Sequence, residues 1–281
     1  MTPRLAWNGY GKAGVHLVKV DRHGPRHQLH DLTVDARLEG KFDEAHTAGD
    51  NTRVLPTDTI KNTVYALARQ GPVDPPEEFG ERLGRHFLRA CPAAHSAVLS
   101  LVVHRWDRAS VDGAAHEHAF TRGPAERRLA TVTVGQTGVR VEAGLDGLGL
   151  LKTAGSGFSG FLRDEYTTLK ETDDRILATD LEARWEYARR PEDYGAAWDA
   201  IRAALVETFA GHSSASVQHT MYAMGQAALA RCGEMDRIRL VLPNRHHLLV
   251  DLAPFGMENP NEIFVATREP YGLIEAVVAR S

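Results

Sequence analysis

The amino-acid sequence predicts an α+β fold in which one unit of two strands, two helices and two strands occurs twice in tandem. Apolar residues alternate with polar ones in several short segments and recur at helical spacing in others, and the second half repeats the segment order of the first. The length of 281 residues also suits two domains of ordinary size. We therefore expect one domain over residues 1–135 and a second over residues 136–281, alike in element order rather than in sequence.

The first unit is predicted to open with a hairpin. Residues 14–20 alternate in character, Gly24 and Pro25 supply a turn, and residues 30–38 alternate again. Two helices and two strands complete the unit. The helices run from a cap at Thr57 or Asp58 to Gly71-Pro72, and from Pro75-Pro76 to Cys91-Pro92; the strands cover residues 96–106 and 128–134.

The second unit is predicted to repeat this order. Its strands cover residues 139–143, 148–152 and 175–187, its helices residues 194–210 and 216–231, and its closing strands residues 238–243, 247–252 and 262–266. A long polar segment, residues 158–175, interrupts the unit before its third strand.

Composition and charge exclude several classes of function. Hydrophobic residues make up 43% of the chain and charged residues 25%, as in globular proteins. The net charge of −4 argues against a nucleic-acid-binding protein, which usually carries a basic surface. No apolar run approaches the length of a membrane span, so no membrane partner is expected.

Cysteine usage and the chain ends predict a cytoplasmic location. Cys91 and Cys232 lack metal-ligand spacing, which favours free thiols in a reducing compartment. The start of the chain has no signal-peptide pattern, and its end is not a peroxisomal tripeptide.

Lys12 and the Thr57-Asp58 pair are candidate functional groups of the first unit. Lys12 follows Gly9-Tyr10-Gly11, but a strand follows it, so this is not a phosphate-binding loop. It is either a surface lysine or a lysine that acts as a base. Thr57 and Asp58 are expected to cap a helix, and the free N–H groups of a helix start can also bind an anion.

In the second unit, Phe158 and Arg175 bound the polar segment. An aromatic face and a guanidinium fork together suit a flat, anionic small molecule. Ser216 is expected to cap a helix, and nearby Gln218 can pair with the donor and acceptor edge of a heterocycle.

Asn244 and His246 lie two residues apart near a strand end, so their side chains can share one face. His246 can equally be a structural histidine. No metal site is expected, because neither His116-Glu117-His118 nor His246-His247 has the spacing of a zinc motif.

Taken together, these stretches closely resemble the cofactor-independent urate oxidases, or uricases. The matching stretches run through nearly the whole chain in the order of the family: Tyr10-Gly11-Lys12, residues 57–63, His104-Arg105-Trp106, and residues 160–170, 174–177, 214–218 and 242–246. Residues 161–170 and the Asn-x-His motif at 244–246 are the most specific.

The resemblance implies a tandem T-fold, or tunnelling fold, with helices on one face of antiparallel sheets that close into β-barrels around a tunnel in a homotetramer. It also implies oxidation of urate by O₂ and water to 5-hydroxyisourate and hydrogen peroxide in purine degradation, with no metal or organic cofactor.

O₂ in its triplet ground state reacts poorly with closed-shell molecules, so oxygenases usually use a metal or flavin. An electron-rich urate dianion can donate an electron itself, if the protein forms it and positions O₂ against its face.

The resemblance also assigns roles to single residues. Lys12, Thr57 and His246 would form the base and proton relay, and Asn244, with Thr57, would face the site of O₂ and water. The substrate would stack on Phe158. Its edges would be held by Arg175, Gln218 and the N–H groups of Asp58 and Val217. Active sites would lie at subunit interfaces, with Lys12, Thr57 and Asp58 supplied by a neighbouring subunit.

Two other functions remain open from the sequence. One is a T-fold hydrolase of a pterin or purine, which would generally place a glutamate where this chain has Gln218 and often use zinc. The other is a non-catalytic purine binder, which would not need a base such as Lys12.

Overall fold

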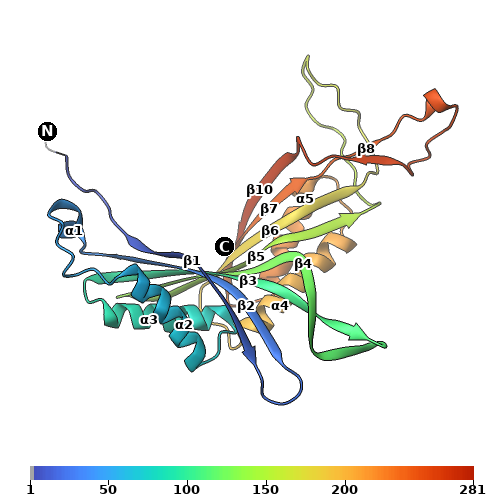
Figure 1. The fold of residues 1–281 in the computed structure, drawn as a ribbon. Helices are drawn as coiled ribbons and strands as arrows, with labels where there is room; N and C mark the ends of the chain where they lie inside the picture. The colour runs from blue at the N-terminus through green and yellow to red at the C-terminus, as the bar shows by residue number, and fades with distance from the viewer. Residues whose placement is uncertain (1–2) are drawn as a thin grey trace. The chain divides into compact units, whose positions relative to one another are not determined.

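The computed structural model describes residues 3–281, and their contacts define two compact units, Met1–Gly144 and Leu145–Ser281 (Figure 1). The division falls inside one long strand, β5 (Gly138–Lys152). Among the described helices, none combines the length and apolar character needed to cross a membrane.

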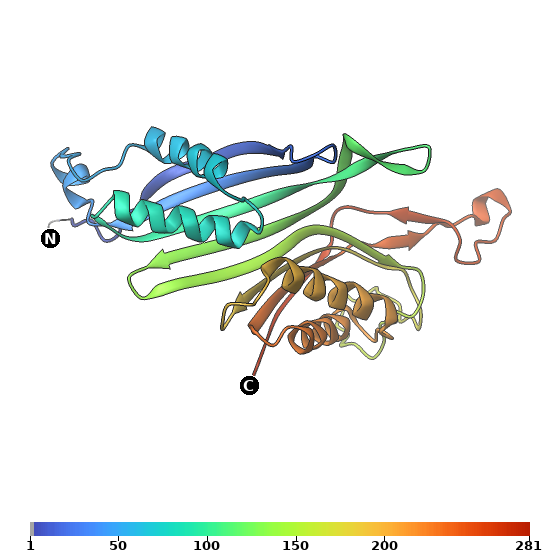
Figure 2. The ribbon, with the colours of Figure 1, turned by 90° about the horizontal axis from the view of Figure 1, so that it is seen from below.

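Unit 1 is an antiparallel sheet with helices on one face (Figure 2). Its other elements are β1 (Tyr10–Asp21), β2 (Gln28–Gly40), α1 (Asp43–Thr47), α2 (Thr57–Gln70), α3 (Pro76–Ala90), β3 (Ala94–Val111) and β4 (Ala114–Gly135). β1 pairs with β2, β2 with β3, and β3 with β4. α2 packs on β1, and α3 packs on β3 and β4.

The core of unit 1 follows from side-chain alternation along these strands. Val15 and Leu17 on β1 are buried. His16, which lies between them, and Val18, which follows them, are exposed. On the helix side, α3 buries Phe79 and packs on β3 and β4. Alternate strand residues point to opposite faces, so one face takes the helices and the other is left without them.

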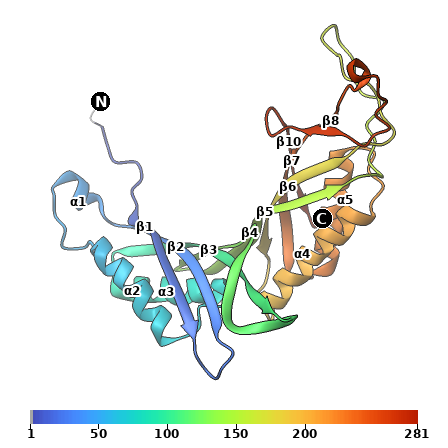
Figure 3. The same cartoon turned by 45° about the vertical axis from the view of Figure 1, so that its right-hand side comes forward.

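Unit 2 repeats this arrangement, with α4 and α5 side by side and α5 on the sheet (Figure 3). Its elements after β5 are β6 (Leu177–Tyr187), α4 (Tyr194–Gly211), α5 (Val217–Arg231), β7 (Met235–Asn244), β8 (His247–Leu249), the 3₁₀ helix η1 (Ala253–Phe255), β9 (Phe264–Ala266) and β10 (Gly272–Ala279). β7 pairs antiparallel with β6 and β10, and β8 pairs antiparallel with β9.

The predicted α+β class is confirmed, and so is the order of two strands, two helices and two strands in unit 1. Two details differ. Residues 139–143 and 148–152 belong to one strand, because Gly147, at a φ of 67°, bends β5 without ending it. β10 was not predicted, because Leu273-Ile274 and Val277-Val278 place apolar residues side by side and blur the alternation. Residues 3–281 contain no closed barrel.

Close packing between α5 and β10 gives a first prediction. A Cβ atom at Gly225 would lie 2.5 Å from Cγ2 of Val278. We expect Gly225→Ala to destabilise the protein by about 1–3 kcal/mol, the usual cost of overpacking. Thermal unfolding should show a lower Tm.

Gly211, the last residue of α4, is the matched control. An added Cβ there meets nothing within 4 Å among the described residues. Gly211→Ala should therefore be neutral or stabilise by up to about 1 kcal/mol, the usual preference of a helix for alanine over glycine. Equal Tm values for the two variants would contradict the close approach of α5 and β10.

Candidate functional site

Lys12 lies at a bulge in β1. It is half-buried and faces Ala36 of β2, and the register of the two strands shifts between Lys12 and Val15. Gly14 adopts a φ of 68°, and its N–H donates to Oδ1 of Asp35 at 2.6 Å. Bulges of this kind change the direction in which neighbouring side chains point, so this one helps to aim Lys12.

The glycine before Lys12 has a steric reason. A Cβ at Gly11 would lie 1.8 Å from the carbonyl oxygen of Ala36, so only glycine fits this approach of β1 to β2. The Gly-Lys pattern that resembles a phosphate loop therefore serves strand pairing, as the absence of a following helix suggested.

The capping predicted for Thr57 or Asp58 is wrong. α2 begins at Thr57, its N-cap is Pro56, and no side chain caps it. The Asp58 carboxylate instead accepts hydrogen bonds from Nζ of Lys61 at 2.5 Å and from Nδ2 of Asn62 at 2.9 Å. The first N–H groups of α2 have no acceptor within the helix, so this end can donate to a ligand.

Electrostatics connect Lys12 with Asp58. The hydrogen bond and charge of Lys61 lower the pKa of Asp58 most, followed by the hydrogen bond from Asn62, and the charge of Lys12 lowers it further. Unit 1 thus places Lys12 on β1 and Thr57 and Asp58 at the start of α2, the helix that packs on β1.

In unit 2, the polar segment folds back so that its two end residues meet. Phe158 pairs with Thr172 through two backbone hydrogen bonds, of 2.8 and 3.1 Å. Nearby, the backbone N–H of Ser156 donates to Oδ1 of Asp174 at 3.1 Å. As a result, Cζ of Arg175 lies 5.2 Å from the centre of the Phe158 ring, and both side chains are half-buried.

Within the part of the chain that the structure describes, the guanidinium of Arg175 lacks a hydrogen-bond acceptor for one of its N–H groups. Among residues 3–281, its buried Nε–H group has no hydrogen-bond partner. Burial also lowers the pKa of the guanidinium, although an arginine remains charged in proteins. A buried donor without an acceptor is costly, and an anionic ligand at this point would satisfy it.

The residues between Phe158 and Arg175 mainly fix the shape of the segment. The ring of Phe161 stacks on Phe158 with centroids 4.9 Å apart and planes 11° apart. Arg163 lies over Phe161, with Cζ 4.9 Å from its centre, and pairs with Glu171 at 3.6 Å. The stacking of Phe161 on Phe158 was not predicted from the sequence, although the Phe-x-x-Phe spacing was the available signal.

The start of α5 is tied to this segment. The Gly157 N–H donates to the carbonyl of Ser214 at 2.8 Å, and the Ser214 N–H donates to Gly155 at 2.9 Å. The predicted cap at Ser216 is confirmed: its hydroxyl accepts from the N–H of His219 at 3.1 Å.

Val217 and Gln218 are the first two residues of this helix. Their N–H groups therefore have no acceptor within it. The Val217 side chain is buried, whereas Gln218 is exposed.

The end of β7 joins the same region. Asn244 is the last residue of β7, and the N–H of Arg245 donates to the carbonyl of Ala178 at 2.9 Å, three residues after Arg175. The Arg245 guanidinium also pairs with Asp180 at 2.6 Å. The backbone carbonyl of His246 accepts from the N–H of Thr267 at 2.9 Å.

Backbone hydrogen bonds thus connect the segments that carry the six predicted residues of unit 2. These residues are Phe158, Arg175, Val217, Gln218, Asn244 and His246.

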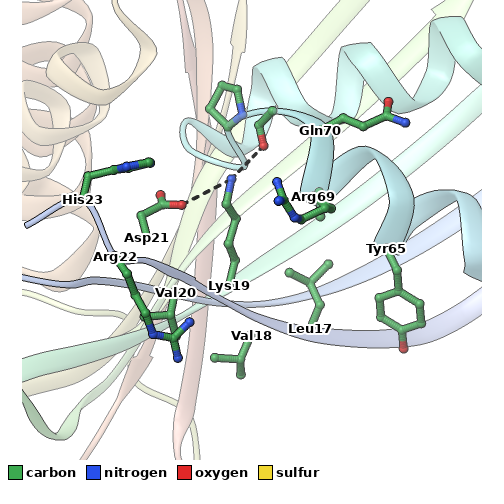
Figure 4. A pocket seen from close by; sticks show the side chains of 13 residues that line it. Leu17, Val18, Lys19, Val20, Asp21, Arg22, His23, Tyr65, Arg69 and Gln70 are labelled. Carbon is green, nitrogen blue, oxygen red and sulfur yellow. Dashed lines mark hydrogen bonds and ion pairs between the residues drawn. The ribbon is translucent and has the colours of Figure 1, made fainter.

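A pocket in unit 1 lies apart from the predicted residues. It is formed by the end of β1 and the end of α2, and none of the predicted site residues lines it (Figure 4). Within it, Nζ of Lys19 donates to the carbonyl of Gly71 at 2.9 Å and lies 3.5 Å from Oδ1 of Asp21. This cation is already engaged by the protein.

Comparisons with known proteins cover nearly the whole chain. The uricase family model matches residues 8–133 and 141–275. The chain is 48% identical to the uricase of Arthrobacter globiformis, over 98% of this chain and 90% of that one. It is 40% identical to the uricase of Aspergillus flavus, over 97% of this chain and 95% of that one.

Solved structures agree with these comparisons. The crystal structure of the Arthrobacter globiformis uricase superposes with a TM-score of 0.94 at 47% identity and covers 100% of this chain and 96% of that one. The fold of urate oxidase from Bacillus sp. TB-90 is also similar, with a TM-score of 0.85 at 24% identity, over 97% of this chain and 100% of that one. The chain therefore belongs to the uricase family and has its T-fold.

Proposed function

We propose that this protein is a urate oxidase that converts urate, O₂ and water to 5-hydroxyisourate and hydrogen peroxide in purine degradation. The observation that carries the proposal is the family match over residues 8–133 and 141–275, which includes every predicted site residue. The reaction balances without another reactant: urate loses two electrons and gains one oxygen from water, and O₂ takes up the two electrons and two protons.

Substrate binding is assigned to unit 2. The Phe158 ring would stack on the purine, and the Arg175 fork would hold one anionic edge. The unpartnered Nε–H of Arg175 and its position beside the ring support this assignment. Gln218 would hold the opposite edge, and the Val217 N–H at the start of α5 would add a further hydrogen bond in the plane of the ring.

Proton removal is assigned to Lys12, Thr57 and His246. The bulge that aims Lys12 and the effect of its charge on Asp58 support a shared role for β1 and the start of α2. The Asp58 N–H would bind the substrate, and Asn244 with Thr57 would hold O₂ and then water against the purine face. The protein would thus supply position and charge, and the substrate its own electrons.

The assembly and location are part of the proposal. We infer a homotetramer in which Lys12, Thr57 and Asp58 of one subunit complete the site of a neighbour. The cytoplasm suits the free, buried thiols of Cys91 and Cys232, since disulfides are rare in reducing compartments.

The direct test mixes purified protein with urate and follows urate absorbance, O₂ consumption and peroxide, with and without a metal chelator. We expect turnover in both conditions. Urate binding without O₂ consumption would indicate a non-catalytic binder, and turnover lost in chelator would contradict the cofactor-free reaction.

Replacing the proposed base should affect chemistry rather than binding. We expect Lys12→Met to lower kcat by about 10²–10⁴-fold, the usual contribution of a general base. The dissociation constant for urate, measured without O₂, should change little. The control is Lys41→Met, which replaces an exposed lysine of the same unit and should keep normal turnover. A fully active Lys12→Met variant would remove Lys12 from the mechanism.

Replacing Arg175, whose guanidinium is proposed to hold the anionic edge of urate, should weaken urate binding. Arg175→Ala should raise the dissociation constant for urate by about 10–100-fold, since hydrogen bonds to charged groups each contribute about 1.5–3 kcal/mol. Arg163→Ala is the matched control, because this arginine also lies over a phenylalanine ring of the segment but has no proposed ligand contact. Equal losses in both variants would indicate that the segment, rather than the Arg175 fork, had been disturbed.

The shared site can be tested by mixing two inactive variants. If Lys12 and Arg175 of one site come from different subunits, co-assembly of Lys12→Met with Arg175→Ala chains should create some intact sites. Co-expression should then restore part of the turnover that each variant lacks alone. No restoration in verified mixed oligomers would contradict the shared site.

A further inference from the structure

Three neighbouring strands of unit 1 place metal-binding side chains together. His16 lies on β1, Asp31 on β2 and His104 on β3. Asp31 is directly opposite His104, and His16 is opposite Thr33, two residues along β2 from Asp31. Because His16 stands between the buried residues Val15 and Leu17, it points away from the helices.

The ligand atoms of these three residues converge. A nitrogen of each histidine and an oxygen of Asp31 all lie within 4.8 Å of one another, and no other such group of three occurs among residues 3–281. Nε2 of His16 is 2.6 Å from Oδ1 of Asp31. Ligands about 2.0–2.2 Å from a zinc ion are about 3–4 Å apart, so a modest rotation of the rings would close the set.

The carboxylate is held in an orientation that suits a ligand. Asp31 is only 4% exposed, and Nε1 of Trp106 donates to its Oδ2 at 2.7 Å. Arg122 also approaches Oδ2, at 3.7 Å, so its charge acts on the oxygen that faces away from His16. Hydrogen-bonded partners of this kind orient metal-ligating carboxylates in proteins.

The solvent exposure of His16 and the chemical type of the three ligands also favour a metal site. The side chain of His16 is 58% exposed, so an ion can enter from solvent and meet the buried carboxylate. Two imidazoles and one carboxylate suit divalent ions late in the first transition series, and three protein ligands leave further positions for water.

We propose that His16, Asp31 and His104 form a site for a divalent transition-metal cation such as Zn²⁺. The site is separate from the residues of the proposed reaction and clamps β1, β2 and β3 together. The two histidine motifs considered from the sequence, His116-Glu117-His118 and His246-His247, do not contribute to it.

The experiment titrates chelator-treated full-length protein with Zn²⁺ by calorimetry and records Tm with and without the ion. We expect one site per chain and a higher Tm when zinc is bound, because an ion that binds the folded state stabilises it. Binding of Co²⁺ should give the visible absorption of a low-coordinate site. Turnover of urate is read separately and should not depend on the ion, so failure of one proposal does not decide the other.

Single substitutions test which residues bind the zinc ion. His16→Ala, at an exposed position, and His104→Ala should each weaken zinc binding by more than about 100-fold, and Trp106→Phe by about 10–100-fold as an orienting partner. The matched control is His30→Ala. His30 also pairs with an aspartate, Asp21, at 3.3 Å, but without a third ligand. No zinc binding by the wild-type protein, or binding that His16→Ala leaves unchanged, would overturn the proposal.

Discussion

The backbone hydrogen bonds at the ends of the 155–178 segment are the interaction on which the candidate site depends. They join Gly155 and Gly157 to Ser214, Phe158 to Thr172, and Ala178 to Arg245. Each bond joins parts of the chain that are far apart in sequence or lie across a long loop. Without these bonds, nothing would fix the positions of the Phe158 ring, the Arg175 guanidinium and the start of α5 relative to one another.

That scaffold also explains why Arg175 suits an anion. Folding half-buries its guanidinium beside Phe158 and leaves Nε–H without an acceptor. The protein bears this cost in the absence of a ligand, and a ligand that supplies the acceptor recovers it. An unsatisfied donor next to an aromatic face, rather than positive charge alone, therefore supports the proposed binding of a flat anion.

Unit 1 positions its groups in a different way. The bulge after Lys12 depends on two glycines, Gly11 for close approach of the strands and Gly14 for a left-handed backbone. On the helix-free face of the same sheet, antiparallel register sets His16, Asp31 and His104 beside one another. Strand pairing produces both the bulge at Lys12 and the cluster of His16, Asp31 and His104, and the members of the cluster come from three different strands.

The sequence by itself determined the fold class, the end of α2, the limits of α3 and the family, because periodicity and short motifs are local properties of the chain. It also named Phe158 and Arg175 as the ends of a clamp. The pairs of Asp58 with Lys61 and Asn62 are local contacts at helical spacing, and the sequence missed them because it placed the start of α2 too late. Tertiary structure alone decided that Phe161 stacks on Phe158. It alone brought His16 to Asp31 and His104. These outcomes depend on register and on chain segments folding back, which local sequence patterns do not encode.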